Sequence, residues 1–119
     1  MKEIELPDFN DMFALVRKIK ELTFEKMKLD LQLDYMKADI TLVATNDPKY
    51  FQKDKAPSMS FLESTYLTTG FEGELIPIKT RLVEIVSDLE EAKMTMQVYR
   101  DIISLYQTES ANMRAATMV

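Results

Sequence analysis

Hydrophobic residues recur at alternating steps of three and four from Met12 to Val43. This is the heptad spacing of an amphipathic helix whose apolar face packs against a neighbouring helix. Nine of the ten positions are apolar, and the exception is Lys26. The pattern predicts a long helix over about residues 9–45, which Pro48 then ends because proline cannot continue the helical hydrogen bonds. The seam positions are Met12, Leu15, Ile19, Leu22, Lys26, Leu29, Leu33, Met36, Ile40 and Val43.

The second half of this helix carries another apolar face, which points roughly away from the first. A helix that is apolar on two sides needs two neighbours, and a single partner helix would leave one side in water. We therefore expect a homo-oligomer. The expected oligomer or partner contacts are Phe24, Met27, Leu31, Tyr35 and Leu42 on this face, and Met113 near the end of the chain.

The segment between the two halves of the chain, residues 46–72, predicts a loop with one short element. Ser60 and Glu63 have the spacing of a capping box, which favours a short helix that Gly70 would end. The run from Ser64 to Thr69 is rich in threonine and contains Tyr66, so a short strand is the competing interpretation. The sequence leaves both open.

A second heptad pattern follows Gly73 and predicts a long helix over about residues 74–115. Two helices of similar length joined by a loop favour an antiparallel hairpin. One register aligns the two seams by pairing Leu29 with Leu89 and Leu33 with Ile85, and it brings Asp39 near Arg81. The predicted fold is all-α: one domain over residues 1–119, a coiled-coil-like helical hairpin with a short helix or irregular element between its arms, completed by oligomerisation.

Lys26 interrupts an otherwise apolar seam. One interpretation is a specificity device, because a polar seam residue can fix the register or the oligomeric state. The simpler interpretation is a lysine at the edge of the seam, whose aliphatic stem packs while its ammonium reaches water.

The segment from Lys49 to Lys55 alternates aromatic and basic residues. Single-stranded nucleic acid would find stacking surfaces and phosphate partners there. The alternative is a loop whose aromatic rings plug the end of the helical bundle while the lysines are solvated. The possible nucleic-acid contacts are Lys49, Tyr50, Phe51, Lys53 and Lys55.

The composition removes several kinds of chemistry. The chain contains no His, no Cys and no Trp, which excludes histidine-dependent triads, thiolate zinc sites and disulfides. Acidic residues such as Glu84 and Asp88 share a helix face, and a solvated face is the simpler interpretation of them than a magnesium site. We expect no enzyme activity, no cofactor and no bound metal.

The net charge of −5 opposes attraction of the whole chain to nucleic acid or to anionic membranes. The first residues lack the apolar core of a signal peptide, and no run has the length of a membrane span. We expect a cytoplasmic protein that does not contact membranes.

Two families share the order of a helix, a loop and a second long helix. Prefoldin-like subunits join their helices by β-hairpins, and no hairpin pattern occurs between Asn46 and Gly73. The stretch Tyr99-Arg100-Asp101-Ile102-Ile103, followed by Asn112, resembles the phage UvsY-type recombination mediators. That resemblance implies a ring-forming helical protein that loads a recombinase onto single-stranded DNA.

The sequence thus favours a non-enzymatic helical assembly protein that self-associates and binds a protein partner through apolar helix faces. The alternative is a recombination mediator or another accessory protein for single-stranded nucleic acid.

Overall fold

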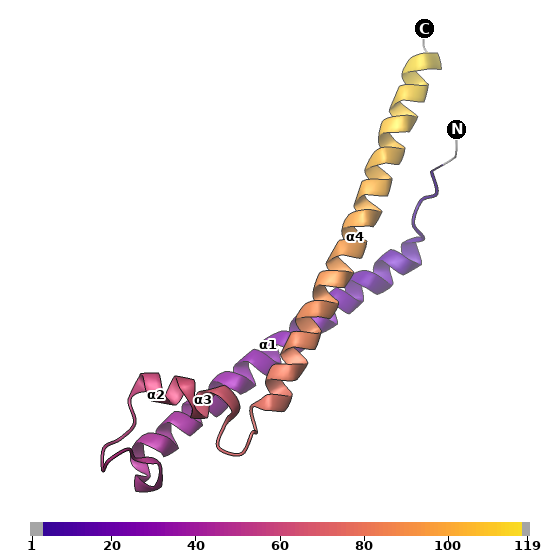
Figure 1. The fold of residues 1–119 in the computed structure, drawn as a ribbon. Helices are drawn as coiled ribbons and strands as arrows, with labels where there is room; N and C mark the ends of the chain where they lie inside the picture. Colours follow the sequence, from indigo (N-terminus) through magenta and orange to yellow (C-terminus); the bar gives the residue numbers. More distant parts are fainter. Residues whose placement is uncertain (1–3, 118–119) are drawn as a thin grey trace. The chain divides into compact units, whose positions relative to one another are not determined.

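A computed structural model describes residues 4–117 of the chain, and its order of elements confirms the predicted all-α helical hairpin. Two long helices, α1 (Phe9–Asn46) and α4 (Ile76–Thr117), form the arms (Figure 1). A 3-10 turn, η1 (Pro48–Tyr50), and two short helices, α2 (Met59–Ser64) and α3 (Tyr66–Thr69), connect them. Residues 4–117 contain no strand, so the competing interpretation of the segment after Ser64 as a strand is wrong.

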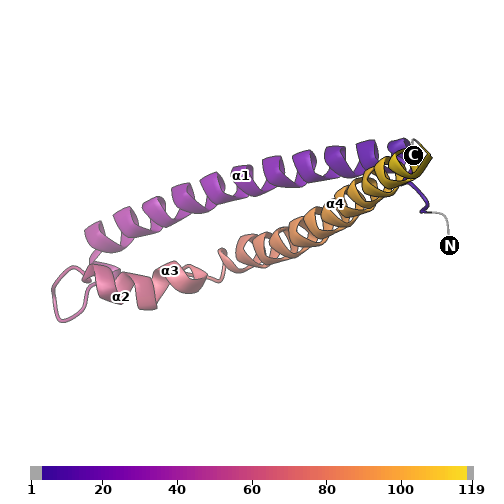
Figure 2. The same cartoon turned by 90° about the horizontal axis from the view of Figure 1, so that it is seen from above.

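The chain forms two compact units, and each long helix contributes to both. Unit 1 combines the chain up to Thr23 with the chain from Ser87 onward, and unit 2 runs from Phe24 to Val86. Within a unit, a stretch of α1 packs against an antiparallel stretch of α4 (Figure 2).

Among the described residues of unit 1, the buried ones lie at heptad positions of the two long helices, Leu22 on the first seam and the others three or four residues apart on the second. They are Leu22 on α1 and Leu89, Ala92 and Met96 on α4, each at most 9% exposed. The three-four spacing in the sequence therefore identifies the faces that these helices bury.

Unit 2 has a core in which the connecting segment replaces part of α4. Ile40 and Ala44 of α1 pack with Leu62 of α2, Leu67 of α3 and Leu75 just before α4. An aromatic group closes this core, and in it Tyr50 stacks on Phe71 with ring centroids 4.3 Å apart and meets Tyr66 edge-on at 5.5 Å. The partly buried residues around the core are Leu33, Met36, Tyr50, Tyr66 and Phe71.

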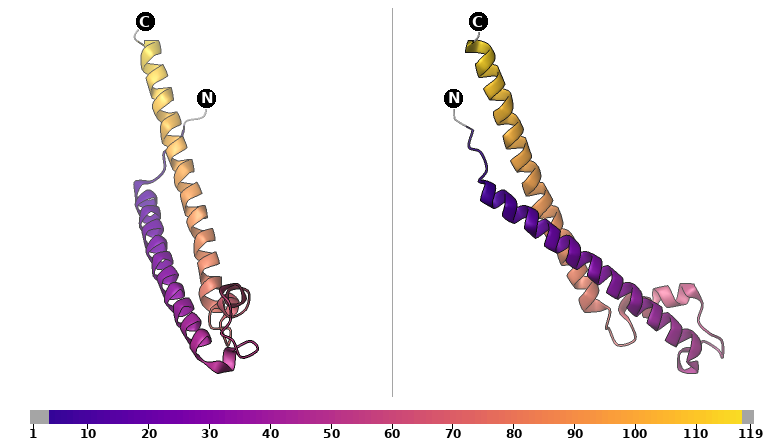
Figure 3. Two further views of the ribbon diagram at one scale, coloured as in Figure 1. Left: turned by 90° about the vertical axis from the view of Figure 1, so that its left-hand side faces the viewer. Right: turned by 180° about the vertical axis from the view of Figure 1, so that it is seen from behind.

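This core overturns the expected register between the two long helices. Arg81 does not lie near Asp39; its guanidinium forms an ion pair with Glu25, at 2.8 Å from Nε to Oε1. The physical reason is that α2 and α3 occupy the space beside the C-terminal end of α1, so α4 begins beside the middle of that helix (Figure 3).

The capping residue of α2 also differs from the expectation. Ser58, not Ser60, caps the helix, and its hydroxyl accepts a hydrogen bond from Phe61 N at 3.2 Å. Ser58 follows Pro57 and has extended backbone angles, as an N-cap residue requires, whereas Ser60 already lies within the helix. Gly70 ends α3, as the sequence predicts.

Gly70 shapes the corner that leads into α4. Its backbone, with φ 91° and ψ −179°, lies in a region that is essentially restricted to glycine. The carboxylate of Glu74 accepts hydrogen bonds from Phe71 N at 2.9 Å and Glu72 N at 2.7 Å, and these bonds lower the pKa of Glu74. A Cβ on Gly70 would lie 2.6 Å from both carboxyl oxygens of Glu74.

We expect Gly70→Ala to destabilise the fold by about 1–3 kcal/mol, because the methyl group strains the backbone and displaces Glu74 from its two amides. Urea unfolding followed by circular dichroism measures the effect. Gly73→Ala is the matched control, since Gly73 also has a positive φ, of 77°, but its Cβ would meet only Ile76 Cδ1 at 3.4 Å. An equal or larger loss of stability in the control would contradict this account of the corner.

Candidate interaction surface

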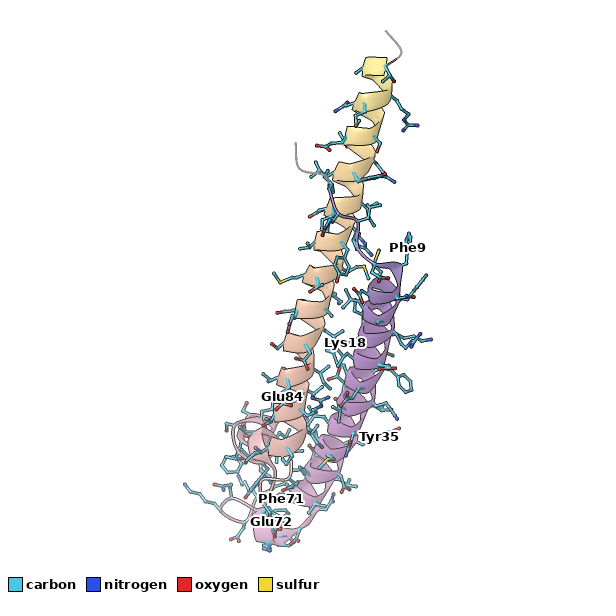
Figure 4. All side chains as sticks on the ribbon, turned by 90° about the vertical axis from the view of Figure 1, so that its right-hand side faces the viewer. Phe9, Lys18, Tyr35, Phe71, Glu72 and Glu84 are labelled. Carbon is cyan, nitrogen blue, oxygen red and sulfur yellow. The ribbon has the colours of Figure 1, made fainter. Side chains whose placement is uncertain are left out.

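Five large apolar side chains of α1 in unit 2 are exposed on one face, which we call the α1 stripe. Their exposed fractions range from 56% to 70%. The opposite side of the same stretch carries Leu33, Met36, Ile40 and Ala44, which pack in the core of unit 2. In Figure 4, Tyr35 lies on the side of α1 that faces away from Glu84 in α4. The stripe consists of Phe24, Met27, Leu31, Tyr35 and Leu42.

Charged side chains border the α1 stripe. Lys28 Nζ lies 5.1 Å from the centroid of the Phe24 ring, so its ammonium covers that ring by a cation–π contact. Asp39 is exposed on the same side of the helix as Lys28, and no ion pair joins either of them to another group within residues 4–117. Both charges are therefore available to a neighbouring molecule.

Exposed apolar residues also occur in the first part of α1, where the heptad pattern does not indicate them. In unit 1, Phe9, Phe13 and Val16 are between 53% and 70% exposed. Phe13 and Val16 stand eleven residues before Phe24 and Met27, and an eleven-residue repeat follows one face of a nearly straight helix. That repeat was the available signal, and the stronger heptad repeat of the seam concealed it.

A shallow groove of about 780 Å³ lies beside the C-terminal end of the α1 stripe in unit 2. Its lining includes the exposed apolar side chains of Ala38 and Leu42 of α1 and Met59 of α2. Lys79 closes one end, where its ammonium donates to Leu67 O at 3.0 Å and Thr68 O at 2.6 Å. Partial burial, followed by the nearby charge of Lys37, lowers the pKa of Lys79. This lysine caps the last carbonyls of α3 and so holds one wall of the groove.

The ion pair between α1 and α4 in unit 2 is bidentate. Arg81 donates to Glu25 from Nε at 2.8 Å and from Nη2 at 3.0 Å, and Nη1 reaches Glu84 at 3.3 Å. The hydrogen bonds from Arg81 are the main reason that the pKa of Glu25 is lowered, and those from Arg81 to Glu25 and Glu84 raise the pKa of Arg81. The pair fixes α4 against α1 beside the start of the α1 stripe.

Lys26 forms an ion pair within its own helix. Its Nζ lies 3.3 Å from Asp30 Oδ2, and the two side chains are 41% and 49% exposed. The ammonium therefore reaches solvent at the edge of the seam, which is the geometry of the simpler interpretation given above.

In the loop from Lys49 to Lys55, the two aromatic rings are partly buried and the lysines are exposed. Tyr50 is held against Phe71 and Tyr66, and Phe51 is half-buried. Lys53 and Asp54 form a tight turn with positive φ, closed by two hydrogen bonds between Gln52 and Lys55. Lys49, Lys53 and Lys55 are all exposed. The structure thus presents three ammonium groups, and that of Lys49 lies 5.5 Å from the centroid of the partly buried Tyr50 ring.

Exposed apolar residues also occur on α4. Met113 in unit 1 is 70% exposed, and Val83 in unit 2 is 71% exposed. The others include Met94, Val98 and Leu105, all in unit 1.

Within the described part of the chain, no group of three or more Asp or Glu side chains is arranged to hold a metal ion. None of the helices between residues 4 and 117 is long and apolar enough to cross a membrane. No family model, curated protein or solved structure matches the chain.

We expect Glu25→Gln to destabilise the protein at neutral pH and to have little effect in acid. Because the folded state lowers the pKa of Glu25 below its ordinary value of 4.5, its stabilising effect is present above that pH and is lost as the pH falls through the lowered value. Urea midpoints of both proteins, measured over a pH series from 7 down to 2, follow the convergence. Glu90→Gln, at an exposed position of α4, is the control, and equal losses in both variants would contradict the prediction.

Proposed function

We propose that this chain is a non-enzymatic helical assembly protein that self-associates and binds a protein partner through exposed apolar helix faces. The observation that carries the proposal is the α1 stripe, in which five large apolar side chains stay more than half exposed opposite a packed core. Full burial of a side chain of this size is worth about 1.5–3 kcal/mol. A continuous row of such side chains is typical of a surface that a second protein covers.

Two further observations support this proposal. The exposed residues of α4, including Val83 and Met113, offer apolar surface outside the α1 stripe on which a different protein could bind. The lack of His and Cys leaves few groups suited to acid–base or nucleophilic chemistry. A cytoplasmic setting is part of the proposal and agrees with the absence of cysteine.

A charge placed in the α1 stripe should abolish self-association. We expect the native chain to have the mass of an oligomer at tens of micromolar, and the double variant Leu31→Asp/Tyr35→Asp to have the mass of a monomer, because burying two carboxylates is costly. Sedimentation or light scattering measures the masses. The control is Val83→Asp on α4, which removes an equally exposed apolar side chain. A monomeric native chain, or loss of the oligomer only in the control, would reject the proposal.

A second candidate function is supported by the three exposed lysines of the loop. Lys49, Lys53 and Lys55 could contact phosphates, as an accessory protein of the recombination-mediator type would require. The packing of Tyr50 against Phe71 argues against it, because stacking on aromatic side chains supplies much of the affinity for single strands.

We therefore expect no salt-sensitive binding to single-stranded DNA at about 50 mM salt. Fluorescence anisotropy with a labelled oligonucleotide measures it. One result would favour the nucleic-acid function over the assembly function. The chain would bind the oligonucleotide, the variant Lys53→Ala/Lys55→Ala would not, and the control variant Lys18→Ala/Lys20→Ala would still bind it.

A further inference from the structure

We propose that the α1 stripe is covered by the α1 stripe of a second copy of this chain, in an antiparallel pairing with a two-fold axis level with residue 33. This proposal rests on the proposed function and adds to it the occupant, the orientation and the register.

The spacing of the α1 stripe fits a two-fold antiparallel pairing. A two-fold antiparallel pairing brings each residue opposite a residue at the same distance on the other side of the axis. The stripe has this symmetry: Phe24 comes opposite Leu42 of the second copy, and Leu31 comes opposite Tyr35. Met27 falls within one residue of the second copy's Ala38, a small exposed residue that leaves room for the methionine.

The charges beside the α1 stripe favour a copy of the same chain as the partner. In this register, Lys28 lies beside Asp39 of the second copy, and the two-fold axis repeats the pair on the other side. Both residues are exposed on one border of the stripe, and neither has an ion-pair partner within residues 4–117. Each copy thus supplies the charge that the other copy's unpaired group needs.

The same charges distinguish this register from its neighbours. A slide of seven residues still brings some apolar residues opposite one another, but it puts the neutral Gln32 or Asn46 of the second copy in the place of Asp39 beside Lys28. Neither residue can pair with an ammonium as Asp39 does. The register with both ion pairs is therefore the favoured one.

The small area of the α1 stripe implies a modest affinity, and this determines the protein concentration at which dimerisation should be measured. From residue 24 to residue 42 the helix rises about 27 Å. One helix face of that length is smaller than the roughly 800 Å² per partner of a standard stable interface. The experiments should therefore use the full chain at a protein concentration of tens of micromolar.

Cysteine cross-linking tests the geometry directly, because the chain has no cysteine of its own. In Lys28→Cys/Asp39→Cys, the two thiols of one chain are about 16 Å apart along the helix, too far for a short bifunctional reagent. Across the proposed interface they are neighbours, so the double variant should give a covalent dimer. Lys28→Cys alone and Asp39→Cys alone should stay uncross-linked, because in the antiparallel pairing residue 28 is about 15 Å and residue 39 about 18 Å along the helix axis from its own copy.

Charge exchange provides an independent readout. We expect Lys28→Asp and Asp39→Lys to weaken dimerisation roughly 3- to 10-fold each, because either change places like charges together twice per dimer. The combined variant should restore the native affinity, since it rebuilds both pairs in reverse.

The outcomes separate this proposal from the proposed function. A native chain that stays monomeric at these concentrations rejects self-association and, with it, this geometry. An oligomer in which Lys28→Cys alone cross-links as well as the double variant, or in which neither cross-links, rejects the antiparallel register and leaves self-association intact. Failure of the combined charge variant to recover affinity also rejects the pairing of Lys28 with Asp39.

Discussion

One geometric constraint governs unit 2: a helix that is apolar on two opposite sides cannot bury both against a single neighbour. On α1, the side that carries Ile40 and Ala44 is covered by the core, and the opposite side, with Leu31 and Tyr35, stays exposed. The hairpin therefore satisfies half of the burial that its first helix requires. Assembly with other molecules is the natural means of satisfying the other half.

The connecting segment decides how α1 and α4 meet in unit 2. Heptad patterns on two helices fit together after any shift of seven residues, so the seams alone do not choose a register. In unit 2 the choice comes from Leu62 and Leu67, which occupy the end of the α1 seam, and from the ion pair of Arg81 with Glu25. These contacts join residues far apart in the sequence, and no local pattern encodes them.

The difference between local sequence patterns and contacts of residues far apart in the sequence also explains which predictions could be made from the sequence. Helix type, the buried faces and the exposed stripe follow from periodicity, which is local and repeated over many residues. The cap of α2 and the position of Tyr50 depend on single residues. Whether Ser58 or Ser60 begins the helix is decided by the direction of the chain after Pro57, and the packing of Tyr50 depends on where Phe71 lies. The role of a single residue such as these can be assigned only when the residues that surround it in the folded chain are known.

Apolar area alone makes a surface adhesive without choosing its partner, because any large apolar face of matching shape gains similar free energy on burial. Binding specificity comes from polar or charged groups whose burial in the interface is unfavourable unless the partner supplies a group that pairs with them. On the α1 stripe these groups are Lys28 and Asp39, which lie on one border and lack partners within the described chain. A partner with the opposite charges at the same separation satisfies both at once, and the chain itself, turned end for end, has that arrangement.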